Sequence, residues 1–157
     1  MTSMKRRIFL KGSLATGAIG MAVGTGLLTP RIALAAWSKE AFEATDVDGA
    51  LNGLFGSSDL TGSDNIKIKA PDIAENGAVV PVSVTTDISG ASSISIIAEK
   101  NANPLAASFD LGPGTEGYVS TRIKMGKTAS VIAVVKADGK LHSTGKEVKV
   151  TIGGCGG

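Results

Sequence analysis

The residues with the clearest chemistry are the last five, Gly153-Gly154-Cys155-Gly156-Gly157. Cys155 is the only cysteine in the sequence. Glycine has no side chain and reaches backbone conformations that other residues avoid, so Gly153, Gly154, Gly156 and Gly157 should leave the thiol uncovered on a flexible arm. A nucleophile on such an arm is not held in register with a base. The pattern therefore predicts that this protein is a carrier, which holds another group covalently on Cys155. It is not expected to be an enzyme itself.

Other candidate ligands are few. Cys155 and His142 are the only cysteine and histidine, which excludes a zinc site built from those ligands, and we expect no metal and no cofactor. His142 follows an expected hairpin, so we place it on a solvated strand. Arg122 should lie on the polar face of a strand as an ordinary solvated charge. Neither residue is expected to carry the function.

Residues 1–35 have the features of an export signal. Arg6 and Arg7 form a twin arginine, a weakly apolar, glycine-rich stretch follows, and Ala33-Leu34-Ala35 offers the small residues that signal peptidases recognise. Twin-arginine signals address proteins that have already folded. A membrane anchor is disfavoured because the apolar stretch is short and broken by glycines. We therefore expect a twin-arginine signal peptide over 1–35 and a periplasmic mature protein.

The charge of the remaining chain excludes one class of function. Residues 1–35 hold five of the 16 Lys and Arg and none of the 14 Asp and Glu, which leaves a net charge of −3 after cleavage. With no basic excess and few aromatic residues, nucleic-acid binding lacks its electrostatic and stacking basis.

No later apolar run is long enough to span a bilayer. A single domain over 36–152 suits this length.

The domain should begin with helix and continue as strands. Ser38 is a candidate N-cap, and apolar residues at helical spacing predict a helix or helix pair over 38–55. After Asn65 the apolar residues alternate, Pro81 suggests an edge strand or bulge, and the run 131–135 suits a strand covered on both faces. Strands are expected at 66–69, 80–85, 94–98, 118–125, 131–135, 140–143 and 148–152, and 106–111 is a further short apolar piece. About seven short strands predict a mainly β, antiparallel sandwich, followed by the arm at 153–157.

The tail, the preceding strand from Lys146 to Ile152 and the twin-arginine signal together resemble the SoxY family, the sulfur-binding subunits of the periplasmic thiosulfate-oxidising system. The similarity extends over the mature chain and is most visible at 103–104, 119–123 and 138–140. It implies an immunoglobulin-like sandwich. It also implies a heterodimer with SoxZ, a subunit without its own signal that is exported with its partner.

The resemblance implies a cycle on Cys155. A c-type cytochrome, SoxXA, would couple thiosulfate oxidatively to the thiol and form a cysteine S-thiosulfonate. A hydrolase, SoxB, would then release sulfate and leave sulfane sulfur on the cysteine, and a sulfane dehydrogenase, SoxCD, is a further candidate partner. Cys155 would be the only covalent site, and the four flanking glycines would let each enzyme accept the same arm.

Two other functions remain open from the residues alone. An exported, non-catalytic assembly module could use the sandwich alone and form an intermolecular disulfide through Cys155. A ubiquitin-like sulfur carrier could use Gly156-Gly157 as a thiocarboxylate, but that chemistry needs ATP-dependent activation in the cytoplasm, and the export signal argues against it.

Overall fold

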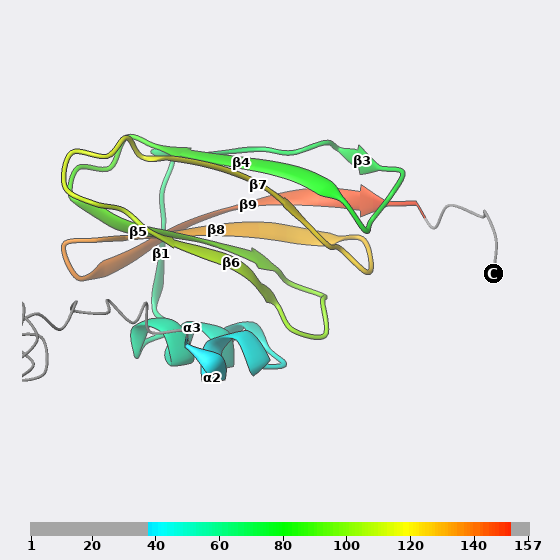
Figure 1. Cartoon of the computed structure of the whole chain (residues 1–157), viewed down its shortest axis with the longest axis horizontal. Coiled ribbons are helices and arrows are strands. Elements are labelled where there is room, and N and C mark those ends of the chain that lie inside the picture. The colour runs from blue at the N-terminus through cyan, green and yellow to red at the C-terminus, as the bar shows by residue number, and fades with distance from the viewer. Residues whose placement is uncertain (1–37, 152–157) are drawn as a thin grey trace, which may run out of the picture. The chain divides into compact units, whose positions relative to one another are not determined.

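Within residues 38–151, which the computed structural model of the protein describes, two short helices precede nine strands (Figure 1). The described residues belong to one compact unit that begins at Ser38. The expected signal peptide, with Arg6 and Arg7, and the arm at 153–157 lie outside the described residues. The elements are α2 (Lys39–Glu43), α3 (Val47–Phe55), β1 (Leu60–Gly62), β2 (Ile66–Lys69), β3 (Ile73–Ala74), β4 (Val80–Thr86), β5 (Ala91–Ala98), β6 (Leu105–Asp110), β7 (Tyr118–Ile123), β8 (Ala129–Ala137) and β9 (Lys140–Val150).

The strands form two sheets that pack face to face. The larger sheet has the order β1-β9-β8-β5-β6, with β3 also paired to β9, and the smaller has the order β2-β4-β7. Neighbours run antiparallel except β1 and β3, each of which is parallel to β9. The expected mainly β sandwich with an N-terminal helical segment is confirmed.

Alternation along the strands builds the core between the sheets. On β4, Val80, Val82 and Val84 are buried while the residues between them point outward or are half-buried. On β8, Val131, Ala133 and Val135 face this core, and Ile132 and Val134 face the helices on the other side of the sheet. The apolar run 131–135 is therefore covered on both faces, as the sequence predicted.

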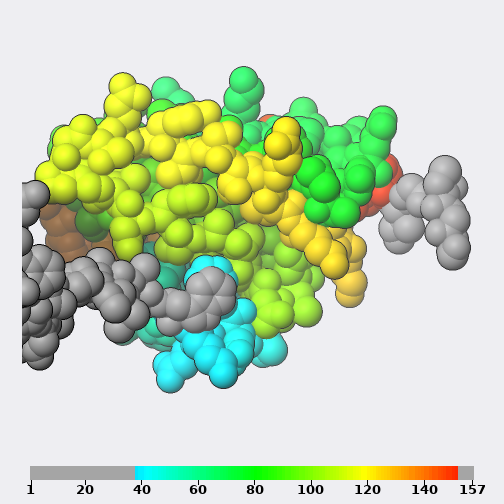
Figure 2. All heavy atoms as spheres, viewed as in Figure 1, coloured from blue at the N-terminus to red at the C-terminus, as the bar shows by residue number. Residues whose placement is uncertain are grey.

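The two helices cover the outer face of the large sheet (Figure 1; cyan in Figure 2). Asp46 caps α3 by accepting a hydrogen bond from the Gly49 amide at 2.7 Å, and Gly56 ends the helix in a left-handed conformation with φ of 76°. Ser38 precedes α2, but its hydroxyl makes no cap and donates instead to the Gly53 carbonyl at 2.8 Å. The helix pair is confirmed, and the capping role of Ser38 is wrong because that hydroxyl joins the two helices.

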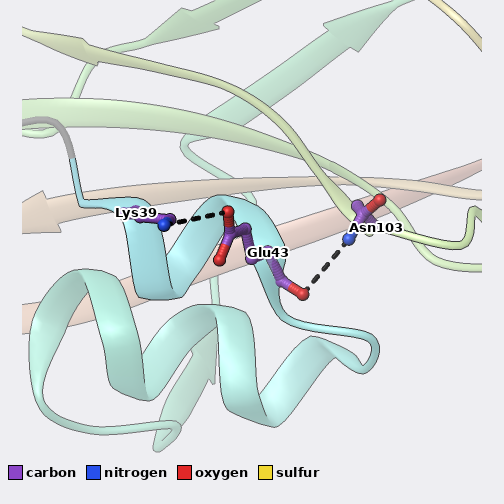
Figure 3. A network of polar contacts seen from close by, with 3 residues as sticks. All are labelled: Lys39, Glu43 and Asn103. Carbon is purple, nitrogen blue, oxygen red and sulfur yellow. Dashed lines mark hydrogen bonds and ion pairs between the residues drawn. The ribbon is translucent and has the colours of Figure 1, made fainter.

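A polar contact holds α2 to the sandwich. Asn103, in the loop between β5 and β6, donates from Nδ2 to the backbone carbonyls of Glu43 and Ala44 at 3.2 and 3.3 Å (Figure 3). Glu43 also forms an exposed ion pair with Lys39 at 3.7 Å. The C-terminal end of α2 is therefore tied to this loop, since Asn103 satisfies carbonyls that the helix leaves free.

Two details differ from the sequence prediction. β4, which contains Pro81, is the middle strand of the small sheet rather than an edge strand. The proline is tolerated because β2 pairs only with residues 83–86, so the side of β4 facing β2 needs no amide donor at position 81. The expected strands at 140–143 and 148–152 are one continuous strand, β9, in the described chain. Among the described residues, no helix is long and apolar enough to cross a membrane.

Candidate functional site

The site predicted from sequence follows β9, so the geometry of interest is how this strand is held where it ends. We call Lys149–Thr151 the arm root. On one edge, the Val150 amide donates to Thr128 Oγ1 at 2.9 Å. On the other edge, the Lys149 amide donates to the Asp72 carbonyl at 2.9 Å, and the Thr151 amide donates to the Ala74 carbonyl at 3.1 Å. Backbone donors along the arm root are thus satisfied from both sides.

Lys146, which lies just before the arm root on β9, makes a further contact between distant segments. Its ammonium donates to the Ala70 carbonyl at 2.6 Å and lies 3.0 Å from the carboxylate of Asp72. Lys146 comes from β9, and its two partners follow β2, so the contact joins the large sheet to the connection that leads into β3. Because Asp72 is 90% exposed, the ion pair adds little, and the hydrogen bond to the carbonyl is the stronger part of the contact.

Close packing completes the arm root on the side of the small sheet. The Met125 amide donates to the Gly77 carbonyl at 2.7 Å. A Cβ atom at Gly77 would overlap the Met125 carbonyl oxygen and lie 2.8 Å from Cγ1 of Val150. Glycine is needed here because two backbone segments approach each other beside the last residues of β9.

The described structure therefore fixes the chain through Thr151, four residues before Cys155. At about 3.3–3.6 Å per residue, covalent geometry limits Cys155 to roughly 14 Å from Thr151. The predicted attachment residue, Cys155, and its flanking residues Gly153, Gly154, Gly156 and Gly157 lie outside the described residues.

The other residues singled out from sequence lie away from the arm root. Arg122 is exposed on the outer face of β7, opposite Pro81, as predicted. His142 is half-buried on β9, between Thr61 of β1 and Val135 of β8. The expectation of a solvated strand is wrong for His142 because β1 covers that edge. Within residues 38–151, no group of histidine, cysteine and carboxylate side chains could hold a metal ion.

Sequence reasoning missed the residues that hold the arm root. Thr128 and Lys146 act on backbone groups that are distant in sequence, and neither belongs to a motif. Gly77 gave a faint signal, as a glycine in a short polar loop before a strand, but its packing against Met125 and Val150 could not be foreseen.

Comparisons with known proteins show which family the chain resembles. The family model described as "Sulfur oxidation protein SoxY" matches residues 51–155, so the match extends through Cys155. Among solved structures, the sulfur carrier protein SoxY from Chlorobium limicola f. thiosulfatophilum is 50% identical. The similarity covers 67% of this chain and 96% of that one, with a TM-score of 0.61.

A search among curated proteins found no match. The family match covers well over half of the chain, and the solved relative shares half of its residues over the aligned region. The chain therefore belongs to the SoxY family, with a role as a sulfur carrier in sulfur oxidation.

Proposed function

We propose that this protein carries the sulfur intermediates of thiosulfate oxidation on Cys155 and presents them to the enzymes that form and consume them. The main support is the contrast at Thr151. The chain is hydrogen-bonded on both edges up to this residue, and the Gly-Gly-Cys-Gly-Gly motif follows after one intervening residue. A firm base followed by residues without side chains suits a thiol that must enter the active sites of other proteins.

The proposed loading step is an oxidation. The Cys155 sulfur bonds to the outer sulfur of thiosulfate, the thiol proton is lost, and two electrons leave. The acceptor is a c-type cytochrome, the SoxXA partner expected for the family. The product is a cysteine S-thiosulfonate, Cys–S–S–SO₃⁻. This chain supplies the attachment atom, and the haem protein supplies the oxidising equivalents.

The proposed release step is a hydrolysis. Water cleaves the bond between the sulfane sulfur and the sulfonate, which releases sulfate with its protons and leaves a persulfide on Cys155. A SoxB-type hydrolase catalyses this step. A SoxCD-type dehydrogenase then oxidises the remaining sulfane sulfur to a sulfonate, with oxygen atoms taken from water, protons released and the electrons passed to a haem acceptor. We further propose that the protein is exported through its twin-arginine signal as a folded pair with a SoxZ-like subunit and works in the periplasm.

The alternative is an exported assembly module joined to a second chain by a disulfide at Cys155. One measurement separates the two functions: the intact mass of the mature protein from thiosulfate-fed cells, before and after a thiol reductant, with Cys155→Ser as the matched control. The proposal expects reductant-labile additions with the mass of a thiosulfonate group or of whole sulfur atoms, absent from the serine variant. Only a bare thiol or a symmetric disulfide under thiosulfate would overturn it and favour the assembly module.

A further inference from the structure

A lysine-lined hollow lies at the end of the sandwich where β9 finishes. It is formed by the loop between β5 and β6 and the loop between β7 and β8, which lie at that end in Figure 1. Its volume is about 590 Å³, and Lys100, Lys124 and Lys127 line it. We call this the lysine hollow.

The loops of the lysine hollow are locked to each other by one side chain. Asn101 donates from Nδ2 to the Lys124 carbonyl at 2.7 Å and accepts from the Gly126 amide through Oδ1 at 3.0 Å. The neighbouring Asn103 ties the first loop to α2, as described above. The three lysines therefore extend from a fixed backbone, although their own side chains are exposed.

The charge of the lysine hollow differs from that of the domain. No carboxylate is among its lining residues, and none of its three lysines forms an ion pair within residues 38–151. Over those same residues the chain has eleven Lys and Arg against fourteen Asp and Glu, a net charge of −3. Three uncompensated cations around one concave site therefore give a local positive potential on an acidic domain, and a concave site concentrates such a potential.

The lysine hollow is connected to the arm root through a single loop. Lys127 is followed by Thr128, whose hydroxyl accepts the hydrogen bond from the Val150 amide. Since Cys155 can lie no more than roughly 14 Å from Thr151, a protein that takes the arm must approach this end of the sandwich.

We propose that the lysine hollow is the docking surface for an acidic rim around the active-site entrance of an enzyme that receives the arm. The proposal rests on the proposed function, because it assumes that the arm enters other proteins. Charge complementarity between the lysine hollow and the acidic rim increases the rate of encounter. It also orients the carrier so that the arm faces the entrance of the active site.

The test uses the full mature chain paired with its partner subunit and loaded with thiosulfonate on Cys155. The probe is the purified SoxB-type hydrolase of the same organism, and the readout is sulfate release at low and at physiological salt. The hollow variant combines Lys100→Glu, Lys124→Glu and Lys127→Glu. The matched control combines Lys67→Glu, Lys69→Glu and Arg122→Glu, which makes the same charge change on the outer face of the small sheet.

The hollow variant should lower kcat/KM by about tenfold or more at low salt while kcat at saturation is retained, because steering acts on encounter and not on chemistry. The deficit should shrink as salt rises, and the control should stay within about twofold of wild type, since its charges are not at the contact. The corresponding Lys→Gln triple variant should show a smaller loss in the same direction.

Equal kcat/KM for the hollow variant and the control would overturn the proposal. So would loss of the partner subunit from the hollow variant, which would make the hollow a subunit interface. Saturable thiosulfate binding to Cys155→Ser that the hollow substitutions abolish would also overturn it, in favour of a small-anion site. If no variant can be loaded at Cys155, the proposed function fails instead, so the two failures are distinguishable.

Discussion

The two ends of the sandwich are built differently. At the end with the arm root, side chains from distant segments bond to the backbone: Thr128 to Val150, Lys146 to Ala70, and Asn101 to two residues of the loop between β7 and β8. At the opposite end, Ser92 Oγ donates to the Lys136 carbonyl at 3.1 Å, but the turn between β8 and β9 is itself closed by Asp138 and Gly139, with φ of 48° and 76°. Local backbone geometry is enough to reverse the chain at this turn. The end of β9, which leads to the arm, is held instead by hydrogen bonds from segments distant in sequence.

The largest expected effect comes from two of the crowded glycines, one at each end of the sandwich. A Cβ at Gly77 would overlap the Met125 carbonyl oxygen, and one at Gly117 would overlap that of Thr86. Gly77→Ala and Gly117→Ala should each destabilise the fold by about 1–3 kcal/mol in chemical denaturation because the neighbouring backbone must shift. Only Gly77→Ala should also speed amide exchange at Val150 and Thr151.

Gly145→Ala is the matched control for both variants, since a Cβ atom at this position would have no neighbour within 4 Å in the described chain. Its stability should stay close to wild type. Faster exchange at Val150 and Thr151 in Gly117→Ala, to the same degree as in Gly77→Ala, would show that the two ends are not independent.

A smaller effect is expected at Lys146. Lys146→Met keeps the aliphatic length but removes the donor to the Ala70 carbonyl, so unfolding free energy should fall by about 1–2 kcal/mol. Asp72→Asn removes only an exposed ion-pair partner and should cost less than about 0.5 kcal/mol. Thermal or urea unfolding of both variants checks the order. An equal loss in the two would mean that the ion pair, and not the hydrogen bond, holds this contact.

The smallest effect concerns Tyr118, which opens β7 at the end away from the arm root. Hydrogen bonds from Ser83 and then Ser120 hold the pKa of Tyr118 below its ordinary value near 10. Because the folded-state pKa is depressed, any stabilisation is fully present above the unfolded pKa and is lost as pH falls through the folded pKa. Ser83→Ala should raise the pKa of Tyr118, as followed by ultraviolet titration of this single tyrosine. The variant also removes the 2.9 Å hydrogen bond between the Ser83 and Ser120 hydroxyls, so a loss of stability at pH 7 would report that bond and not the tyrosine. A wild-type titration at the ordinary pKa would contradict this assignment.

Much of the fold could be predicted because its signals are local. Alternating valines such as Val80, Val82 and Val84 mark the inner face of a strand, and the apolar run around Ala133 marks a strand covered on both faces. β1 and β3 escaped prediction because strands of three and two residues leave no period to detect, and both depend on β9 for their pairing. The expectation that Pro81 marks an edge strand was wrong for a related reason. A proline is tolerated at this position of β4 because the neighbouring strand β2 ends before reaching it.

The candidate site also has a part that sequence can predict and a part that it cannot. Cys155 and its glycines are a contiguous motif, so sequence could single them out. The hold on the arm root and the lysine hollow could not be predicted, because Thr128, Lys146 and Asn101 act on partners more than twenty residues away. Such pairs come together only through sheet topology.

The position of β9 also has a consequence for the order in which the protein folds. β9 is the last strand in the described chain, yet it lies within the large sheet and pairs with β1 and β3, about eighty residues earlier. The sheet therefore stays incomplete on the ribosome until the final strand has emerged, and its closure depends on long-range contacts that form slowly. The segment that leads to Cys155 is thus fixed in place only when the whole domain is folded.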